Sequence, residues 1–171
     1  MTTAGCPGIK DSSSLRNAKG TPGERRRLPG CRPLGILCNP KNTAQTLSAR
    51  QWLAGLRAAG RRVIVPEIAD YEVRRELIRV KSRRGLPNLD QLVLRLEYLP
   101  LNTPAMRRAA ELWAQARQRG QPTAASQSLD ADVILAGQAL TLGVSPIVVA
   151  TANVGHLSRF LSAELWQNIA P

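Results

Sequence analysis

The chain has 171 residues, of which 43% are hydrophobic and only 4% aromatic, so it is long enough for one domain with an aliphatic core. Its 24 basic and 12 acidic residues give a net charge of +12, which favours a polyanion such as RNA as a partner. No apolar run approaches the roughly 20 residues that cross a bilayer, and three cysteines with one histidine leave little room for a zinc site. We therefore expect a cytoplasmic protein with reduced thiols and no membrane association.

The first part of the chain differs in composition from the rest. Residues 1–32 are rich in Gly, Pro, Ser and Arg and lack apolar periodicity, so we expect a disordered basic extension. Three origins stay open: a nucleic-acid-binding tail, an organellar transit peptide, or translation of sequence upstream of the true start. Residues 33–171 are predicted to form the folded domain.

Short apolar runs and amphipathic segments alternate along this domain. Leu34–Cys38 is predicted as the first strand, and Arg61–Pro66 as the second, with a helix from Thr43 to Gly60 between them. This βαβ unit makes the two strands parallel. Further elements are predicted in the remainder of the chain: helices over 67–85, 87–96, 103–120 and 130–143, strands over 98–101 and 147–150, and a short helix or edge segment over 160–171.

Acidic and amide side chains fall near the predicted strand ends. Glu72 follows the second strand, Asp130 and Asp132 begin the helix before the last clear strand, and Asn153 follows that strand. Because sites of open α/β sheets lie at the carboxyl ends of the strands, these side chains should converge. Carboxylates without Cys or His partners suit Mg²⁺ or Mn²⁺, and on a basic surface such a site suggests phosphodiester hydrolysis.

Glu72, Asp130 and His156 also have structural explanations. An exposed ion pair of Glu72 with Arg75 is worth about 0.3–0.5 kcal/mol, and the helix pattern alone favours this explanation. Asp130 can stabilise a helix start without any metal. For His156, a loop hydrogen bond is favoured over a phosphate contact.

Longer motifs carry a family resemblance. Pro33–Gly35 (P-L-G), Val65–Leu77 (V-P-E-I-A-D-Y-E-V-R-R-E-L), Leu129–Ala136 (L-D-A-D-V-I-L-A) and Ala150–Leu157 (A-T-A-N-V-G-H-L) resemble the PIN domain, the nuclease fold of VapC-type toxins. The resemblance extends from about Pro33 to the end of the chain. It implies an α/β fold in which a central parallel sheet of about four to five strands carries helices on both faces.

The resemblance also implies a metal-dependent endoribonuclease. Glu72 and Asp132 match catalytic metal-ligand positions, and Asp130 is an auxiliary candidate. Asn153 stands where many PIN domains have Asp, so it brings an oxygen without charge and holds a metal less tightly. Thr151 is expected to orient the site or to cap the loop, with His156 as a second supporting residue.

One family position departs from the pattern. Alignment on Pro33–Gly35 puts Gly30 where the first metal-binding Asp of the family should stand, and Leu28–Arg32 does not resemble a strand. The chain is then either a degenerate PIN domain or one whose first thirty or so residues come from a shifted frame or a wrong start. We favour the second explanation, because Pro33 onward is intact.

Two function classes follow from these expectations. The first is a PIN endoribonuclease that uses Mg²⁺ or Mn²⁺ and is impaired because Gly30 replaces the first catalytic Asp. It is a candidate toxin of a pair with a small antitoxin. The second is an inactive PIN-like module that still binds RNA. The arginines proposed to contact RNA are Arg74, Arg75, Arg107 and Arg108. PIN domains commonly dimerise, so the resemblance also makes a homodimer an expectation.

Overall fold

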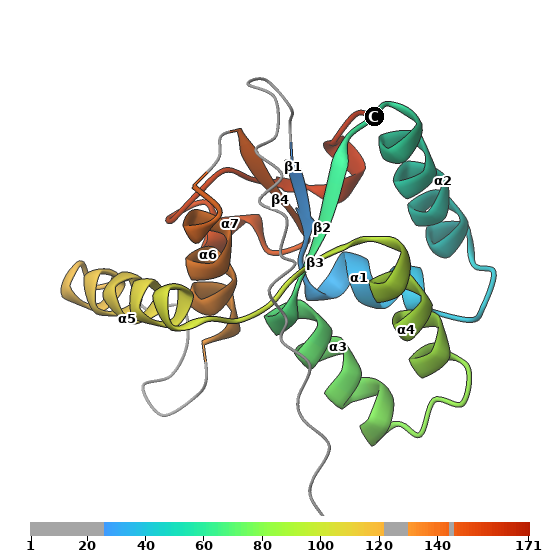
Figure 1. The fold of residues 1–171 in the computed structure, drawn as a ribbon, viewed down its shortest axis with the longest axis horizontal. Coiled ribbons are helices and arrows are strands. Elements are labelled where there is room, and N and C mark those ends of the chain that lie inside the picture. The colour runs from blue at the N-terminus through green and yellow to red at the C-terminus, as the bar shows by residue number, and fades with distance from the viewer. Residues whose placement is uncertain (1–25, 122–129, 144–145) are drawn as a thin grey trace, which may run out of the picture.

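The computed structural model describes residues 26–121, 130–143 and 146–171, which form a five-stranded parallel sheet with helices on both faces (Figure 1). The strands are β1 (Arg26–Pro29), β2 (Arg62–Pro66), β3 (Glu97–Leu99), β4 (Ile147–Thr151) and β5 (Ala163–Leu165), in the order β3-β2-β1-β4-β5. The helices are α1 (Cys31–Cys38), α2 (Ala44–Ala58), α3 (Glu67–Arg79), α4 (Gly85–Arg95), α5 (Thr103–Gln118), α6 (Ala131–Thr141) and α7 (Val154–Leu157), followed by a 3₁₀ turn over Trp166–Asn168. The predicted fold class is confirmed.

The central strand β1 lies inside the segment predicted as an extension. Its first residues, Arg26 and Arg27, pair with Arg62 and Val63 of β2, and the whole strand pairs with Ile147–Ala150 of β4. Both arginines are buried. The prediction that no strand precedes Gly30 is therefore wrong, and the opening of the sheet is present. Residues 1–25 of the predicted extension lie outside the described residues.

The predicted strand over Leu34–Cys38 is also wrong, because these residues belong to helix α1. Leu34, Leu37 and Cys38 are buried at the i, i+3, i+4 spacing of one helix face. Pro33 lies in the first turn, where a missing N–H costs no intrahelical hydrogen bond. The crossover from β1 to the parallel strand β2 thus contains both α1 and α2.

Two other helix ends differ from the prediction. Helix α3 stops at Arg79 because Lys81 adopts a left-handed backbone with φ 51°, and Gly85 begins α4 instead of closing α3. Helix α5 begins at Thr103, and its cap is Asn102, whose side chain accepts a hydrogen bond of 2.8 Å from the Ala105 N–H. None of the residues at these helix ends lines the cavity described below.

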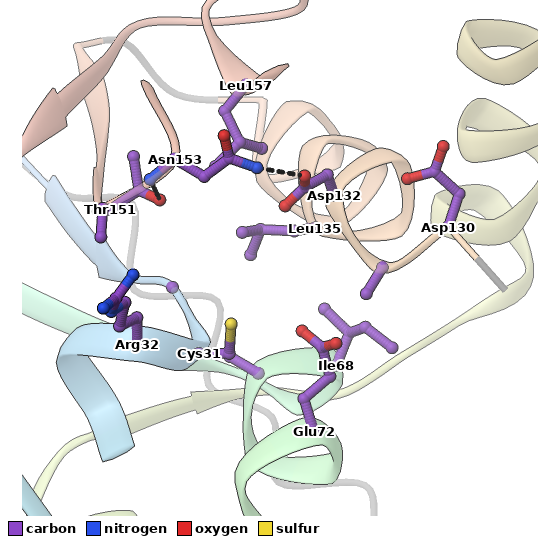
Figure 2. A pocket seen from close by; sticks show the side chains of 14 residues that line it. Cys31, Arg32, Ile68, Glu72, Asp130, Asp132, Leu135, Thr151, Asn153 and Leu157 are labelled. Atoms are coloured by element: carbon purple, nitrogen blue, oxygen red, sulfur yellow. Dashed lines mark hydrogen bonds between the residues drawn. The ribbon is translucent and has the colours of Figure 1, made fainter. Parts of the chain in front are cut away.

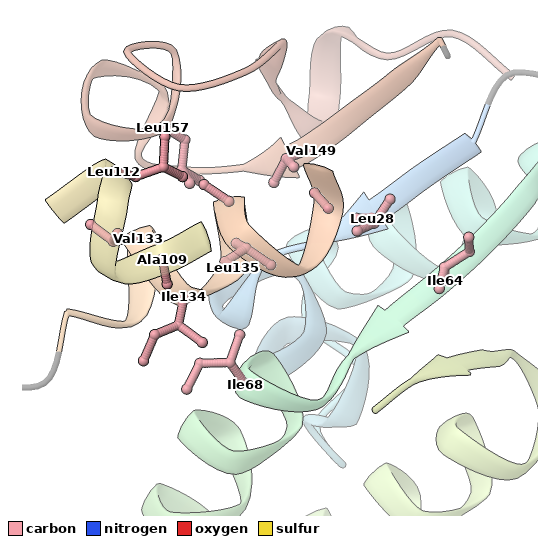
Figure 3. Close-up of a cluster of buried hydrophobic side chains, with 12 residues drawn as sticks. Leu28, Ile64, Ile68, Ala109, Leu112, Val133, Ile134, Leu135, Val149 and Leu157 are labelled. Carbon is pink, nitrogen blue, oxygen red and sulfur yellow. The ribbon is translucent and has the colours of Figure 1, made fainter. Parts of the chain in front are cut away.

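Side chains of alternate strand residues supply cores on the two faces of the sheet. Ile64 and Val149 pack with α3, α5 and α6 in the cluster of Figure 3, whereas Val63 and Val148 pack with α1 and α2. This alternation follows from the period of two along each strand. The apolar strand runs are therefore buried on both faces, as parallel strands usually are.

Helix α6 is buried from Val133 to Ala139 and fixes α3 against the sheet. Its Gly137 allows close packing with α5, since a Cβ there would lie 2.5 Å from the Ala105 carbonyl oxygen. The next residue, Gln138, is fully buried; its amide oxygen accepts from the Ile68 N–H at 3.2 Å, and its amide nitrogen donates to the Leu99 carbonyl at 2.8 Å. One α6 side chain thus joins the start of α3 to the end of β3.

None of the helices in the described part of the chain is both long enough and apolar enough to span a membrane.

Candidate active site

A cavity of about 460 Å³ opens at the carboxyl ends of β1 and β4 (Figure 2). Its walls come from the start of α1, the first turns of α3, the start of α6 and the residues that follow β4. The lining residues are Gly30, Cys31, Arg32, Ile68, Ala69, Glu72, Asp130, Ala131, Asp132, Leu135, Thr151, Ala152, Asn153 and Leu157. The predicted convergence of Glu72, Asp130, Asp132 and Asn153 on one cavity therefore matches the structure.

Asp132 faces this cavity from the first turn of α6. Its Oδ2 accepts a hydrogen bond of 2.9 Å from the Asn153 side-chain amide, and Nδ1 of His156 lies 3.2 Å from the same oxygen. Partial burial raises the pKa of Asp132 above its ordinary range, against the opposing effect of the hydrogen bond to His156. Asn153 and His156 therefore hold the Asp132 carboxylate in place from the segment after β4.

Glu72 faces the cavity from the second turn of α3, opposite Asp132 (Figure 2). One carboxylate oxygen accepts from Arg75 at 3.3 Å, and the Arg75 guanidinium lies over the Tyr71 ring at 5.4 Å. The ion pair foreseen as an alternative explanation therefore exists, yet the same carboxylate also lines the cavity. The two explanations of Glu72 are compatible.

Asp130 plays a different part from the other two acids. Its side chain accepts a hydrogen bond of 3.2 Å from the Val133 N–H, which makes it the N-cap of α6, and the residue is buried. In Figure 2 its carboxylate lies to one side of the Glu72 and Asp132 pair, toward α5. The capping explanation thus matches the hydrogen bond to Val133, whereas the auxiliary role stays a prediction.

Thr151 and His156 sit around the segment that carries Asn153. The Thr151 hydroxyl accepts a hydrogen bond of 2.9 Å from the Asn153 backbone N–H, which fixes the turn at the end of β4. His156 lies in α7 and reaches Asp132 as described above. Thr151 thus contacts Asn153 and His156 contacts Asp132, and a supporting role for the two residues stays a prediction.

Gly30 lies directly after β1, in the wall of the cavity. Its backbone is extended, with φ −70° and ψ 177°, and its N–H donates to the Ala150 carbonyl at 2.8 Å. A Cβ at this position would lie 3.5 Å from the Ala150 oxygen, 3.7 Å from the Thr151 hydroxyl and 3.8 Å from Leu135, which are ordinary contacts. A Cβ atom therefore fits here without a clash, and the φ angle of the residue is one that L-residues adopt.

Four arginines were predicted to contact RNA, and they differ in their surroundings. Arg74 forms ion pairs with Asp70 at 3.0 Å and with Asp90 at 2.8 Å, whereas Arg75 forms an ion pair with Glu72. Arg107 and Arg108 lie on α5, where Arg108 pairs with Glu111 at 2.7 Å and Arg107 is exposed. Arg107 is thus the most available of these charges.

The donor set of the cavity limits the cation that could bind there. Within the described part of the chain, no three His, Cys, Asp or Glu side chains are close enough to form a metal cluster. Glu72 and Asp132 remain as carboxylates that face the cavity. Mg²⁺ keeps several waters and commonly takes one or two protein carboxylates together with substrate phosphate, so this pair fits such an ion.

Two further lining residues, Cys31 and Arg32, were not identified from the sequence as site residues. Cys31 is exposed, yet partial desolvation, followed by the charge of Glu72, raises the pKa of its thiol to about 11. Arg32 lies across the cavity from Glu72 and Asp132, below Thr151 (Figure 2). Both residues directly follow Gly30, so recognition of β1 as a strand would have placed them at the site.

The elements described so far form a parallel α/β sheet with two opposed carboxylates that face one cavity at its carboxyl edge. The model of the PIN domain family matches residues 39–158, and the chain belongs to this family. The match begins after β1 and α1, so these two elements are placed in the domain by the structure.

Comparison with solved structures supports the same fold. A chain of VapBC2 from Rickettsia felis, bound to a promoter DNA fragment, is 18% identical with a TM-score of 0.62, covering 81% of this chain and 97% of that one. A chain of VapBC-1 from nontypeable Haemophilus influenzae is 18% identical with a TM-score of 0.60, and the match covers 84% of this chain and 99% of that one. A chain of DNA-bound VapBC from Salmonella typhimurium is 20% identical with a TM-score of 0.60, and the match covers 82% of this chain and 98% of that one. Comparison with curated proteins gives no match.

Proposed function

We propose that this protein is a metal-dependent endoribonuclease of the PIN family. Its activity is expected to be weak because Gly30 stands where the family resemblance implies a metal-binding Asp. The observation that carries the proposal is the pair of carboxylates, Glu72 and Asp132, opposed across a cavity at the carboxyl edge of the sheet. The net charge of +12 supports RNA as the substrate.

In this proposal Glu72 and Asp132 hold a divalent cation, Mg²⁺ or Mn²⁺. Such an ion activates water and neutralises the charge that develops on the phosphate. Asn153 and His156 orient the Asp132 carboxylate, and Thr151 fixes the backbone that carries Asn153. Asp130 secures the start of α6 and thereby the position of Asp132.

Gly30 explains why the activity is expected to be weak. It leaves a third wall of the cavity without a charged ligand, at a position where a side chain fits. An Asp at this position adds one carboxylate beside the existing pair, which increases the electrostatic attraction for a divalent cation. The structure at Gly30 is thus compatible with either loss of the ligand in a degenerate domain or an altered N-terminal sequence.

The test compares the wild-type chain with Gly30→Asp and its isosteric neutral control Gly30→Asn. We expect little Mn²⁺-dependent cleavage of single-stranded RNA by wild type, at least tenfold faster cleavage by Gly30→Asp, and no gain in Gly30→Asn. Adding Asp132→Asn to Gly30→Asp should abolish the gain while circular dichroism shows an intact fold. Equal rates for wild type and Gly30→Asp would reject the assignment of Gly30.

We also propose a protein partner, a small antitoxin, because the similar solved structures are of VapBC proteins. Co-expression with the neighbouring small reading frame followed by co-purification tests this partner. A homodimer is proposed on the same resemblance, and its mass can be measured by light scattering.

A second candidate function is an inactive PIN-like RNA-binding module. Neutral residues, Gly30 and Asn153, line the cavity at two positions where the family resemblance implies a metal-binding Asp, and they favour this function. RNA binding that is independent of Mg²⁺ in wild type, together with no cleavage by Gly30→Asp, would support the binding module over the nuclease.

A further inference from the structure

A second cavity, of about 560 Å³, continues from the candidate site between α1 and α3. We call it the α1–α3 groove. Its residues are Cys31, Arg32, Gly35, Ile36, Asn39, Glu72, Val73, Arg75, Glu76 and Leu77. Aliphatic side chains from both helices form much of its surface, and Cys31, Arg32 and Glu72 line both cavities.

Arg32 lies at the junction of the site and the groove. Its side chain is exposed and forms no ion pair with any described residue. By contrast, Arg75, the other arginine of the groove, is paired with Glu72. Arg32 therefore brings an uncommitted positive charge to the point where the two cavities meet.

The site has opposite charges on opposite walls. Glu72 and Asp132 are negative, and Arg32 faces them across the opening (Figure 2). Two carboxylates alone repel a phosphodiester, whereas a guanidinium donates paired hydrogen bonds to phosphate oxygens. A cation at the carboxylates and a phosphate at Arg32 match this distribution of charge.

We propose that Arg32 binds the backbone phosphate of a single-stranded RNA at the junction, and that the adjoining nucleotide lies in the α1–α3 groove. This inference rests on the proposed function and adds the path of the substrate. The base covers the aliphatic surface of Ile36, Val73 and Leu77, while Arg32 fixes the phosphate between the groove and the site.

The nearest alternative is the groove between α2 and α4, which contains Arg50, Arg57 and Arg95. It is separate from the candidate site, since none of its lining residues also lines the acidic cavity. An RNA held there would need another contact to bring a phosphate to Glu72 and Asp132. Continuity with the acidic cavity therefore favours the α1–α3 groove.

The first experiment measures binding of a fluorescein-labelled single-stranded RNA of about six nucleotides by anisotropy in Mg²⁺, with its integrity checked on a gel. Arg32→Ala should weaken binding about tenfold and reduce the slope of log affinity against log salt by about 0.7, the value for one phosphate contact on a single strand. Arg57→Ala, which also removes an exposed arginine, should change the affinity less than twofold. Equal effects of the two substitutions would overturn the role of Arg32.

The second experiment tests the groove with a matched pair of substitutions. Ile36→Glu places a charge in the groove and should weaken the same RNA about tenfold. Leu94→Glu, at a 77% exposed position on α4, adds the same charge elsewhere and should have little effect. Equal affinities of the two variants would show that the groove holds no nucleotide.

Cleavage separates this inference from the proposed function. In the Gly30→Asp background, Arg32→Ala should raise KM for RNA about tenfold with kcat changed less. If Gly30→Asp does not cleave RNA, the proposed nuclease function fails. If it cleaves and Arg32→Ala leaves KM unchanged, only the inference about Arg32 fails.

Discussion

The side-chain amide of Asn153 donates a hydrogen bond of 2.9 Å to the carboxylate of Asp132. A neutral amide therefore satisfies one oxygen of an acid in the candidate site without any cation. His156 approaches the same oxygen at 3.2 Å, so two groups from the segment after β4 stabilise this carboxylate. These contacts hold the Asp132 carboxylate in place and would compete with the proposed cation for it.

Asn153→Asp should destabilise the metal-free protein and strengthen binding of a divalent cation. Two carboxylates at hydrogen-bond distance repel each other, so the metal-free variant should lose about 1 kcal/mol, which lowers Tm by about 2–4 °C. Mn²⁺ should then raise Tm of the variant more than that of wild type, because the native state gains a charged ligand. Differential scanning calorimetry with and without Mn²⁺ measures both effects. Asn153→Ala is the control, and an equal Mn²⁺ shift in all proteins would contradict the prediction.

Gln138→Leu should destabilise the whole domain. The substitution leaves the buried Ile68 N–H and Leu99 carbonyl without the partners they have in the native protein. At about 1–3 kcal/mol for each group, the free energy of unfolding should fall by about 3 kcal/mol in urea denaturation. Gln115→Leu, an exposed position on α5, serves as the control. A change below 1 kcal/mol in Gln138→Leu would mean that water or relaxation satisfies both groups.

Glu72→Gln should make Cys31 more reactive. Desolvation and then the negative charge of Glu72 raise the pKa of the Cys31 thiol to about 11, so loss of that charge lowers the pKa and increases the thiolate fraction at pH 8. Alkylation by iodoacetamide, followed by peptide mass spectrometry, reports each cysteine separately. Cys38 is fully buried with its thiol pKa raised to about 12 by burial, so it should react only on unfolding. The control is Glu111→Gln on α5; a Cys31 rate unaffected by Glu72→Gln would count against the coupling.

Arg74→Ala should affect stability more than RNA binding. Arg74 contacts Asp70, which is only 8% exposed, and also pairs with Asp90 on α4. Because Arg74 itself is partly exposed, the expected loss is about 1–2 kcal/mol. Arg107→Ala, at an exposed position on α5, should leave stability unchanged and weaken RNA binding. Urea unfolding and anisotropy applied to both variants decide between these roles, and a reversed pattern would reject the assignment.

The sequence predicted β2, α3, α6 and β4 because their apolar patterns have clear periods or lengths. These elements carry Glu72, Asp132 and Asn153, so convergence of the acidic residues could be predicted as well. Strand β1 could not, because Arg26, Arg27 and Pro29 are unusual in a central strand. Helix α1 was missed because a short apolar run fits a strand or a buried helix equally well. The hydrogen bond from Asn153 to Asp132 depends on side-chain positions that no sequence pattern specifies.

The position of β1 sets the smallest piece of this chain that can form a continuous sheet. Strand β1 is hydrogen-bonded to β2 on one side and β4 on the other, so among the described strands it alone connects the pair β3-β2 to the pair β4-β5. A protein that begins at Pro33 would have two separate half-sheets, with Glu72 attached to one and Asn153 to the other. Any expressed fragment meant to keep the site together must therefore begin at or before Arg26.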